Sequence, residues 1–98
     1  MDENASTRGD TFVWRQGSSE VVLSRESDGW SVIFASTGKL AGPRHVIYEA
    51  KHKEAKYAAW DVMARVVRAS SDEEQGLRVA RSAARWMRDT GTGSDYDD

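Results

Sequence analysis

The hydrophobic period of this chain changes at residue 50, and this change constrains the fold more than any other feature of the sequence. Before residue 50, short segments alternate between apolar and polar residues, which is typical of β-strands that bury one face. After it, apolar residues recur with the 3.6-residue period of an amphipathic helix. The sequence therefore predicts an α+β domain, with a small antiparallel sheet followed by two C-terminal amphipathic helices.

Four strands are expected in the first half of the chain. In the first of them Phe12 and Trp14 share one face, and the pair Asp28-Gly29 favours a tight hairpin between the second and the third. Because short turns connect successive segments, the simplest topology is a four-stranded antiparallel meander. The alternating segments are "TFVWRQ", "EVVLSR", "WSVIFAS" and "RHVIYEA".

Two helices are expected in the second half. The first should cover about residues 51–69 and place its apolar stripe against the sheet. Ser71 followed by Glu74 matches a capping box, so the second helix should begin near Asp72. It should end near Asp89–Gly91, where glycine can form a C-terminal cap. The residues expected to meet in the core are Trp30, Val32 and Phe34 from the sheet, with Ala59, Val62 and Val66 from the first helix.

Charge is distributed unevenly along the chain, although the total is only −2. Residues 1–10 carry −2 and residues 89–98 carry −4, which leaves +4 on residues 11–88. We expect residues 1–10 and 90–98 to be disordered acidic tails around one domain at 11–89. Such tails are solubilising, or they compete with a polyanion for the basic body.

Composition and motifs argue against several classes of function. Cysteine is absent, so there is no disulfide or thiolate site, and no apolar run reaches the roughly 20 residues that span a membrane. His45 and His52 lie on different expected elements without metal-ligand spacing, and no phosphate-binding glycine motif is present. We expect a cytoplasmic, non-enzymatic protein without a cofactor or metal.

The main candidate site is an arginine stripe on the second helix. At about 100° per residue, its four arginines fall within an arc of about 80°. A solvated helix face usually mixes charges, whereas arginine suits phosphate and carboxylate groups. The stripe is therefore either an ordinary wet face or a binding surface. Its members are Arg78, Arg81, Arg85 and Arg88.

A second candidate site combines basic and aromatic residues on the sheet. Strict alternation would place Tyr48 on the same face as Arg44, and Arg15 lies opposite Trp14. Rings beside cations suit single-stranded nucleic acid, because bases stack while cations track the phosphates. The alternative is that the sheet aromatics only fill the core.

These patterns predict a small module that binds nucleic acid through a basic helix face, with Arg15, Arg44 and Tyr48 as further contacts. The alternative is a protein-interaction or inhibitor module that docks an acidic partner. Two amphipathic helices and a sheet present more apolar surface than one small body hides easily, which favours a homodimer. On that view Trp86 and Met87 are buried, either against the first helix or across a two-fold interface.

Overall fold

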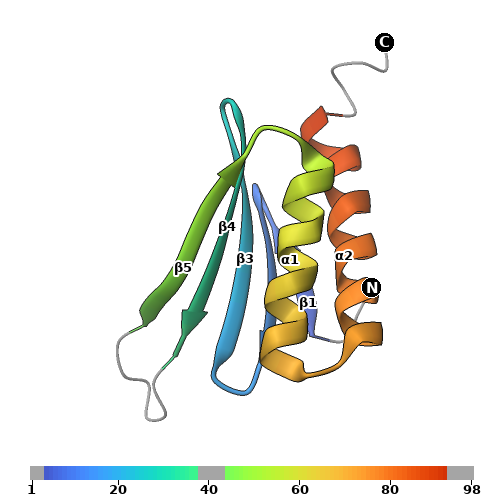
Figure 1. Ribbon diagram of the computed structural model, residues 1–98. Helices are drawn as coiled ribbons and strands as arrows, with labels where there is room; N and C mark the ends of the chain where they lie inside the picture. Colours follow the sequence, from blue (N-terminus) through green and yellow to red (C-terminus); the bar gives the residue numbers. More distant parts are fainter. Residues whose placement is uncertain (1–3, 38–43, 93–98) are drawn as a thin grey trace.

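A five-stranded antiparallel sheet occupies the first half of the chain in the computed structural model, which describes residues 4–37 and 44–92 (Figure 1). The strands follow each other in chain order across the sheet, so the topology is a meander. The predicted α+β fold with an antiparallel meander is confirmed, but the sheet has one strand more than predicted. The strands are β1 (Ala5–Arg8), β2 (Thr11–Gln16), β3 (Ser19–Glu26), β4 (Gly29–Ser36) and β5 (His45–His52).

The additional strand is β1, which the sequence analysis placed in an acidic tail. It pairs with β2 from Ala5 opposite Trp14 to Arg8 opposite Thr11, after a turn in which Gly9 has a φ of 58°. Only Ala5 of this strand is buried, so no apolar alternation marks it in the sequence. The strand forms because its backbone satisfies the otherwise open edge of β2. Residues 1–3 and 93–98 of the expected tails lie outside the described residues.

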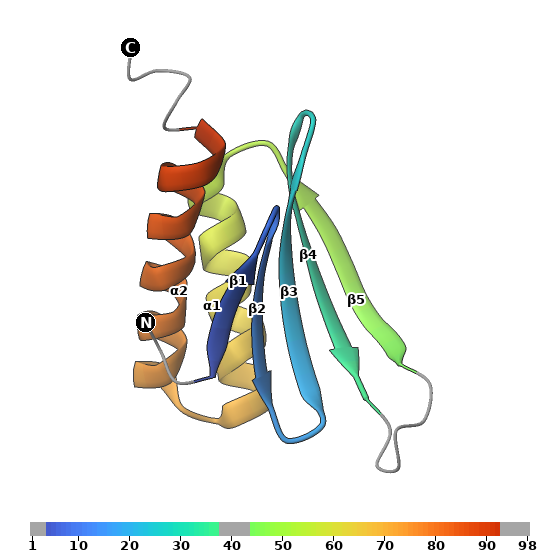
Figure 2. The same ribbon diagram turned by 180° about the vertical axis from the view of Figure 1, so that it is seen from behind.

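Two antiparallel helices cover one face of the sheet (Figures 1 and 2). They are α1 (Ala55–Ser70) and α2 (Glu73–Met87), and a π-helical turn, η1 (Arg88–Thr92), continues α2. Both helices lie where the change of period predicts them. However, α1 begins at Ala55 rather than near residue 51, because β5 continues as far as His52.

The connection between the helices is only two residues long, and its capping differs from the predicted capping box. Asp72 is the N-cap of α2, and its Oδ1 accepts a hydrogen bond from the Gln75 amide at 3.0 Å. Ser71 instead adopts the left-handed conformation that ends α1, with a φ of 58°. Glu73 and Glu74 lie in the first turn of α2, where acidic residues suit the helix dipole.

The core lies between the helices and the covered face of the sheet. Trp86 of α2 packs against Phe12 and Trp30, with ring centroids 6.1 and 5.9 Å apart. Trp86 and Met87 were predicted to be buried, either against the first helix or across a two-fold interface. Both are buried within one chain, with Trp86 against aromatic residues of the sheet, so they do not need a second subunit to cover them. The other main members of the core are Trp14, Val21, Leu23, Val32, Ala59, Val62, Val66, Val79 and Ala83.

An irregularity in the pairing of β4 with β5 changes which way the start of β5 faces. Phe34 pairs with Tyr48, but the next residue, Ala35, pairs with Val46, so Ile47 is an extra residue. This shift places Tyr48 on the helix-covered face and Val46 on the opposite one. The strict alternation assumed from the sequence, which put Tyr48 on the same face as Arg44, is therefore wrong.

Candidate interaction surface on the helical layer

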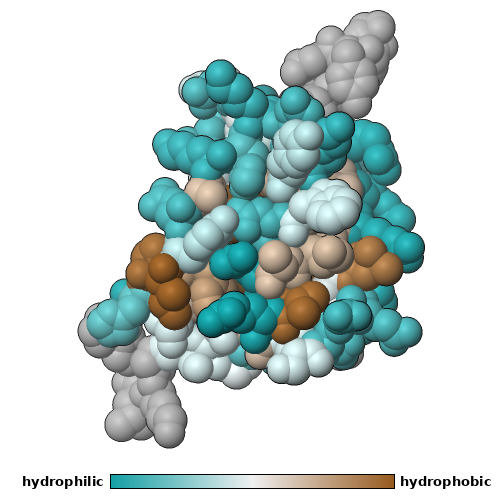
Figure 3. All heavy atoms as spheres, viewed as in Figure 1, coloured by the Kyte–Doolittle hydropathy of each residue, from teal (hydrophilic) through white to brown (hydrophobic). Residues whose placement is uncertain are grey.

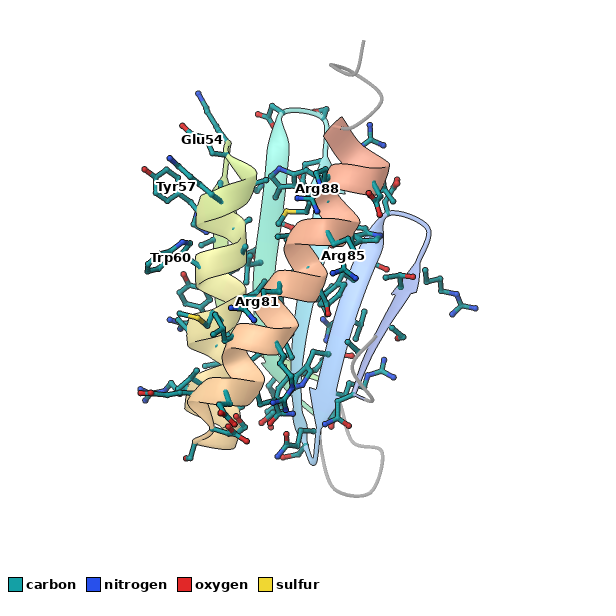
Figure 4. The ribbon with its side chains drawn as sticks, turned by 90° about the vertical axis from the view of Figure 1, so that its right-hand side faces the viewer. Glu54, Tyr57, Trp60, Arg81, Arg85 and Arg88 are labelled. Atoms are coloured by element: carbon teal, nitrogen blue, oxygen red, sulfur yellow. The ribbon has the colours of Figure 1, made fainter. Side chains whose placement is uncertain are left out.

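The arginine stripe lies on α2 and on the first residue of η1, Arg88, and all four of its side chains are exposed. Among the ion pairs of the described residues, none involves Arg81, Arg85 or Arg88. Arg81 borders a groove shared with α1, whereas Arg85 borders a hollow shared with Thr7 of β1 (Figure 4). The stripe therefore faces two different surfaces, one on each side of α2.

Arg15 and Arg44 lie on the other layer of the molecule, where no helix covers the sheet. Their Nε atoms lie 2.8 and 3.0 Å from the two carboxylate oxygens of Glu20, whose side chain is buried. Each carboxylate oxygen thus has one guanidinium partner. These contacts link β2 and β3 to the residue just before β5. Arg15 and Arg44 therefore lie on the uncovered face of the sheet, away from the arginine stripe.

Tyr48 belongs to a third location, between β5 and α1. Its hydroxyl donates a hydrogen bond to Asp61 Oδ2 at 2.9 Å, and the Arg65 guanidinium lies 4.0 Å from the centre of its ring. The ring is therefore occupied by a residue of the same chain and does not share a face with Arg44. The seven residues proposed from the sequence do not form one continuous nucleic-acid surface.

Asp61 is the centre of this inter-layer cluster. In addition to Tyr48, its Oδ2 lies 2.7 Å from His52 Nε2, and its Oδ1 lies 3.4 Å from Arg65 Nε. Partial burial, the hydrogen bond to Asp61 and the charge of Asp61 raise the pKa of Tyr48, while the charge of Arg65 opposes them. The cluster fastens α1 to the edge strand β5.

An apolar groove runs between α1 and α2 on the side facing away from the sheet. It has a volume of about 360 Å³. The basic side chains of Lys56 and Arg81 lie at its rim. Its apolar lining consists of Ala59, Trp60 and Met63 from α1, with Leu77, Ala80 and Ala84 from α2.

Small residues explain why the groove exists. At Gly76 the two helices approach so closely that an added Cβ would overlap the Val67 side chain and lie 3.2 Å from the Met63 carbonyl oxygen. One and two turns further along α2, Ala80 and Ala84 leave the seam shallow instead of filling it. The larger side chains on either side then form its walls.

The walls of the groove carry the most exposed aromatic residue of the helical layer. Trp60 is 67% exposed, Tyr57 is 53% exposed and Leu77 is 43% exposed. Tyr57 and Trp60 project from one flank of α1, one turn apart (Figure 4). In the space-filling view, tan and brown patches lie over the helices among hydrophilic residues, and a further brown patch lies at the left over the start of β5 (Figure 3). An exposed apolar area with a polar rim is typical of an interaction site.

A second hollow, of about 670 Å³, continues this surface toward the end of α1. It shares Met63 and Leu77 with the groove, so the two are contiguous. Together their linings contain four basic residues and one acidic residue, Glu73. One of the basic residues, Arg65, is already paired with Asp61, so three cations against Glu73 leave a charge of +2. The basic residues are Lys56, Arg65, Arg68 and Arg81. We call the groove and this hollow the helical groove.

The sequence analysis missed the helical groove, because it examined only the apolar stripe of α1 that faces the sheet. The signal was present in Trp60, an aromatic residue outside the apolar stripe that faces the sheet. Tyr57, one turn before it, is also exposed but does not line the groove. Large apolar side chains outside the core-facing stripe indicate a second buried face or a binding face.

Comparison with known proteins leaves the function to be argued from this geometry. The chain matches no protein-family model, no curated protein and no solved structure at a significant level. Within residues 4–37 and 44–92, no group of three or more His, Cys, Asp or Glu side chains could hold a metal ion. Neither helix of that part of the chain is long and apolar enough to cross a membrane.

Proposed function

We propose that this protein is a non-enzymatic protein-interaction module whose helical layer docks an acidic partner. The observation that carries the proposal is the helical groove, in which Trp60 is 67% exposed beside apolar residues and a lining charge of +2 after the Arg65–Asp61 pair is left out. The sheet-facing side of the helices already fills the core, so the groove is additional apolar surface. The absence of cysteine fits the reducing cytoplasm, where we place the protein.

Trp60 is suited to be the energetic centre of such an interface. Tryptophan and arginine are enriched among interface residues whose truncation costs about 2 kcal/mol or more. Here Trp60 and Arg81 line the same groove, so an apolar anchor and a cation meet one partner surface. The basic lining selects for acidic partners and disfavours basic ones.

Nucleic-acid binding is the second candidate, and the exposed arginines of α2 favour it. Arg81, Arg85 and Arg88 have no ion-pair partner among the described residues, which leaves their guanidinium groups accessible to phosphates. Against it, Arg15, Arg44 and Tyr48 are engaged by other residues elsewhere. A protein partner accounts for Trp60 as well as Arg81, so we rank it first.

A display experiment tests the proposal without a known partner. A library of peptides with random mixtures of acidic and apolar residues is selected on the protein, and single- and double-stranded oligonucleotides are titrated separately. Selected peptides should lose roughly tenfold in affinity with Trp60→Ala or Arg81→Ala, about 1.4 kcal/mol each. The matched controls are Ile47→Ala and Arg8→Ala, which remove an exposed apolar and an exposed basic side chain outside the groove.

The same experiment can reject the proposal. If no selected peptide depends on Trp60, the groove is not a protein-docking site. If oligonucleotides bind, and Arg81→Ala combined with Arg85→Ala lowers the salt dependence of that binding by about two phosphate contacts, nucleic acid takes first place.

A further inference from the structure

We infer that the occupant of the helical groove is an amphipathic α-helix of a partner protein, with acidic residues beside its apolar face. This inference rests on the proposed docking function and adds the conformation and pattern of the partner. It would make the docked assembly three layers deep, with the partner helix on the outer side of α1 and α2 and the sheet on their inner side.

The length of the apolar surface fits two turns of a helix. Along α1 it extends from Trp60 to Val67, about 10 Å at 1.5 Å per residue. Apolar residues at positions i, i+3, i+4 and i+7 of a docked helix cover the same distance. The alanines of the seam, Ala59, Ala80 and Ala84, allow the backbone of a third helix to approach closely.

The surface of α1 and α2 favours a helix over an extended segment. Helix interiors have no free backbone donors or acceptors, so a strand laid across them could not pair its own amides and carbonyls. Buried backbone groups without partners cost free energy, whereas a helix satisfies them internally. An extended peptide would need an open sheet edge, which the helical groove does not have.

The basic residues around the groove favour acidic residues on both sides of the partner helix's apolar face. They also argue against a second copy of this chain as the occupant. Lys56 and Arg81 border the groove, and Arg68 lies at its other end. Acidic residues on the docked helix would meet these cations. In a two-fold dimer through the same surface, residues near the axis would face their own copies, and like charges would oppose each other.

Defined peptides test this inference. The probe is a capped peptide of about 18 residues, or ~27 Å as a helix, with leucine at i, i+3, i+4 and i+7 and glutamate on both flanks. Its three matched peptides have the same composition in scrambled order, a central proline, or lysine in place of glutamate. Binding is followed by amide chemical shifts of the protein and by circular dichroism of the peptide.

We expect the probe to gain helicity on binding and to shift the amides of α1 and α2. The scrambled and proline peptides should bind at least tenfold more weakly, because they lack the apolar stripe or the helix. Trp60→Ala should lower the affinity of the protein for the probe by a similar factor. Arg81→Glu should lower the affinity for the glutamate probe and raise the affinity for the lysine peptide. A folding defect would not produce this reversal.

Separate outcomes overturn the two proposals. If library peptides bind through Trp60 but the proline peptide binds as well as the probe, docking stands and the helical occupant is wrong. If no acidic peptide binds through the groove, both fail. Sedimentation that shows a dimer, lost in Trp60→Ala, would overturn the partner helix and assign the groove to a second copy.

Discussion

Asp61 is a buried acceptor on which three side chains from two elements converge. Its carboxylate accepts a hydrogen bond from the Tyr48 hydroxyl at 2.9 Å and lies 2.7 Å from His52 Nε2, and Arg65 forms an ion pair with it. A helical wheel alone assigns Asp61 to the solvent side of α1. Its burial follows from β5, which brings two polar side chains to that flank of the helix.

Replacing Asp61 should therefore cost more than an ordinary surface change. We expect Asp61→Ala to lower the free energy of unfolding by about 2–3 kcal/mol, because Tyr48 and His52 lose their acceptor in a partly buried place. Urea unfolding measures the change. The matched control is Glu49→Ala, which removes an exposed carboxylate from β5, the strand that carries Tyr48 and His52, with an expected change within about 0.5 kcal/mol. Equal stability of the two variants would show that the cluster does not fasten the layers.

Tyr48 should make the stability depend on alkaline pH. Its pKa in the folded protein is raised above the ordinary value of about 10 by partial burial and by Asp61. Above pH ~10 the unfolded chain loses the tyrosine proton while the folded protein retains it, so this contribution is complete below that pH and falls as pH rises. Tyr48→Phe should remove this part of the alkaline slope in urea unfolding.

The titration of Tyr48 can be observed directly. The difference in tyrosinate absorbance between the parent and Tyr48→Phe isolates this one side chain, and its midpoint should lie above pH 10. A midpoint at or below that value would contradict the contact with Asp61.

At the level of the elements, the hydrophobic period predicted the strands and helices that bury a regular apolar face. It did not predict features that depend on strand pairing or on helix capping. Strands β2 to β5, both helices and the break between the helices were predicted from the sequence. Strands β2 to β4 and the helices were predictable because each buries a regular apolar face. Strand β1 does not, because only Ala5 is buried and its pairing with β2 is a tertiary event. The irregular pairing at Ile47 reversed the face of Tyr48, which no alternation rule could anticipate. The arginines of α2 are exposed as predicted, whereas the groove beside them depends on how closely two helices approach.

Gly76 tests that helix–helix approach. In an ordinary helix Gly→Ala stabilises by up to about 1 kcal/mol. Here the new methyl group would overlap Val67 and crowd the Met63 carbonyl, so we expect Gly76→Ala to destabilise the protein by about 1–3 kcal/mol. Urea unfolding gives the sign.

The matched variants for this test are Val67→Ala and the double substitution. In the double variant the overlapping side chain is shortened, so the two changes should destabilise by less than their sum. A more stable Gly76→Ala protein would mean that the helices are further apart than described, and the groove would lose its structural basis.

At the scale of the whole molecule, the two layers carry different surface features. The helices bury one side in the core and present the basic, apolar helical groove on the other, while the uncovered sheet face holds the Arg15–Glu20–Arg44 contacts. The predicted homodimer stays a prediction, but its main reason is weaker, because Trp86 and Met87 are covered within one chain.

The acidic C-terminal residues should compete with the partner for the basic helical layer. Asp95, Asp97 and Asp98 follow α2 closely in the sequence, although they lie outside the described residues. Their attachment gives them a high effective concentration near the arginines of the helix. Removing residues 93–98 should therefore tighten binding of the glutamate peptide severalfold at low salt. At about 1 M salt, where the screening length is ~3 Å, the gain should disappear. Replacing the three aspartates by asparagine separates charge from length: it should reproduce the deletion, whereas an unchanged affinity would show that the tail's charge does not reach the groove.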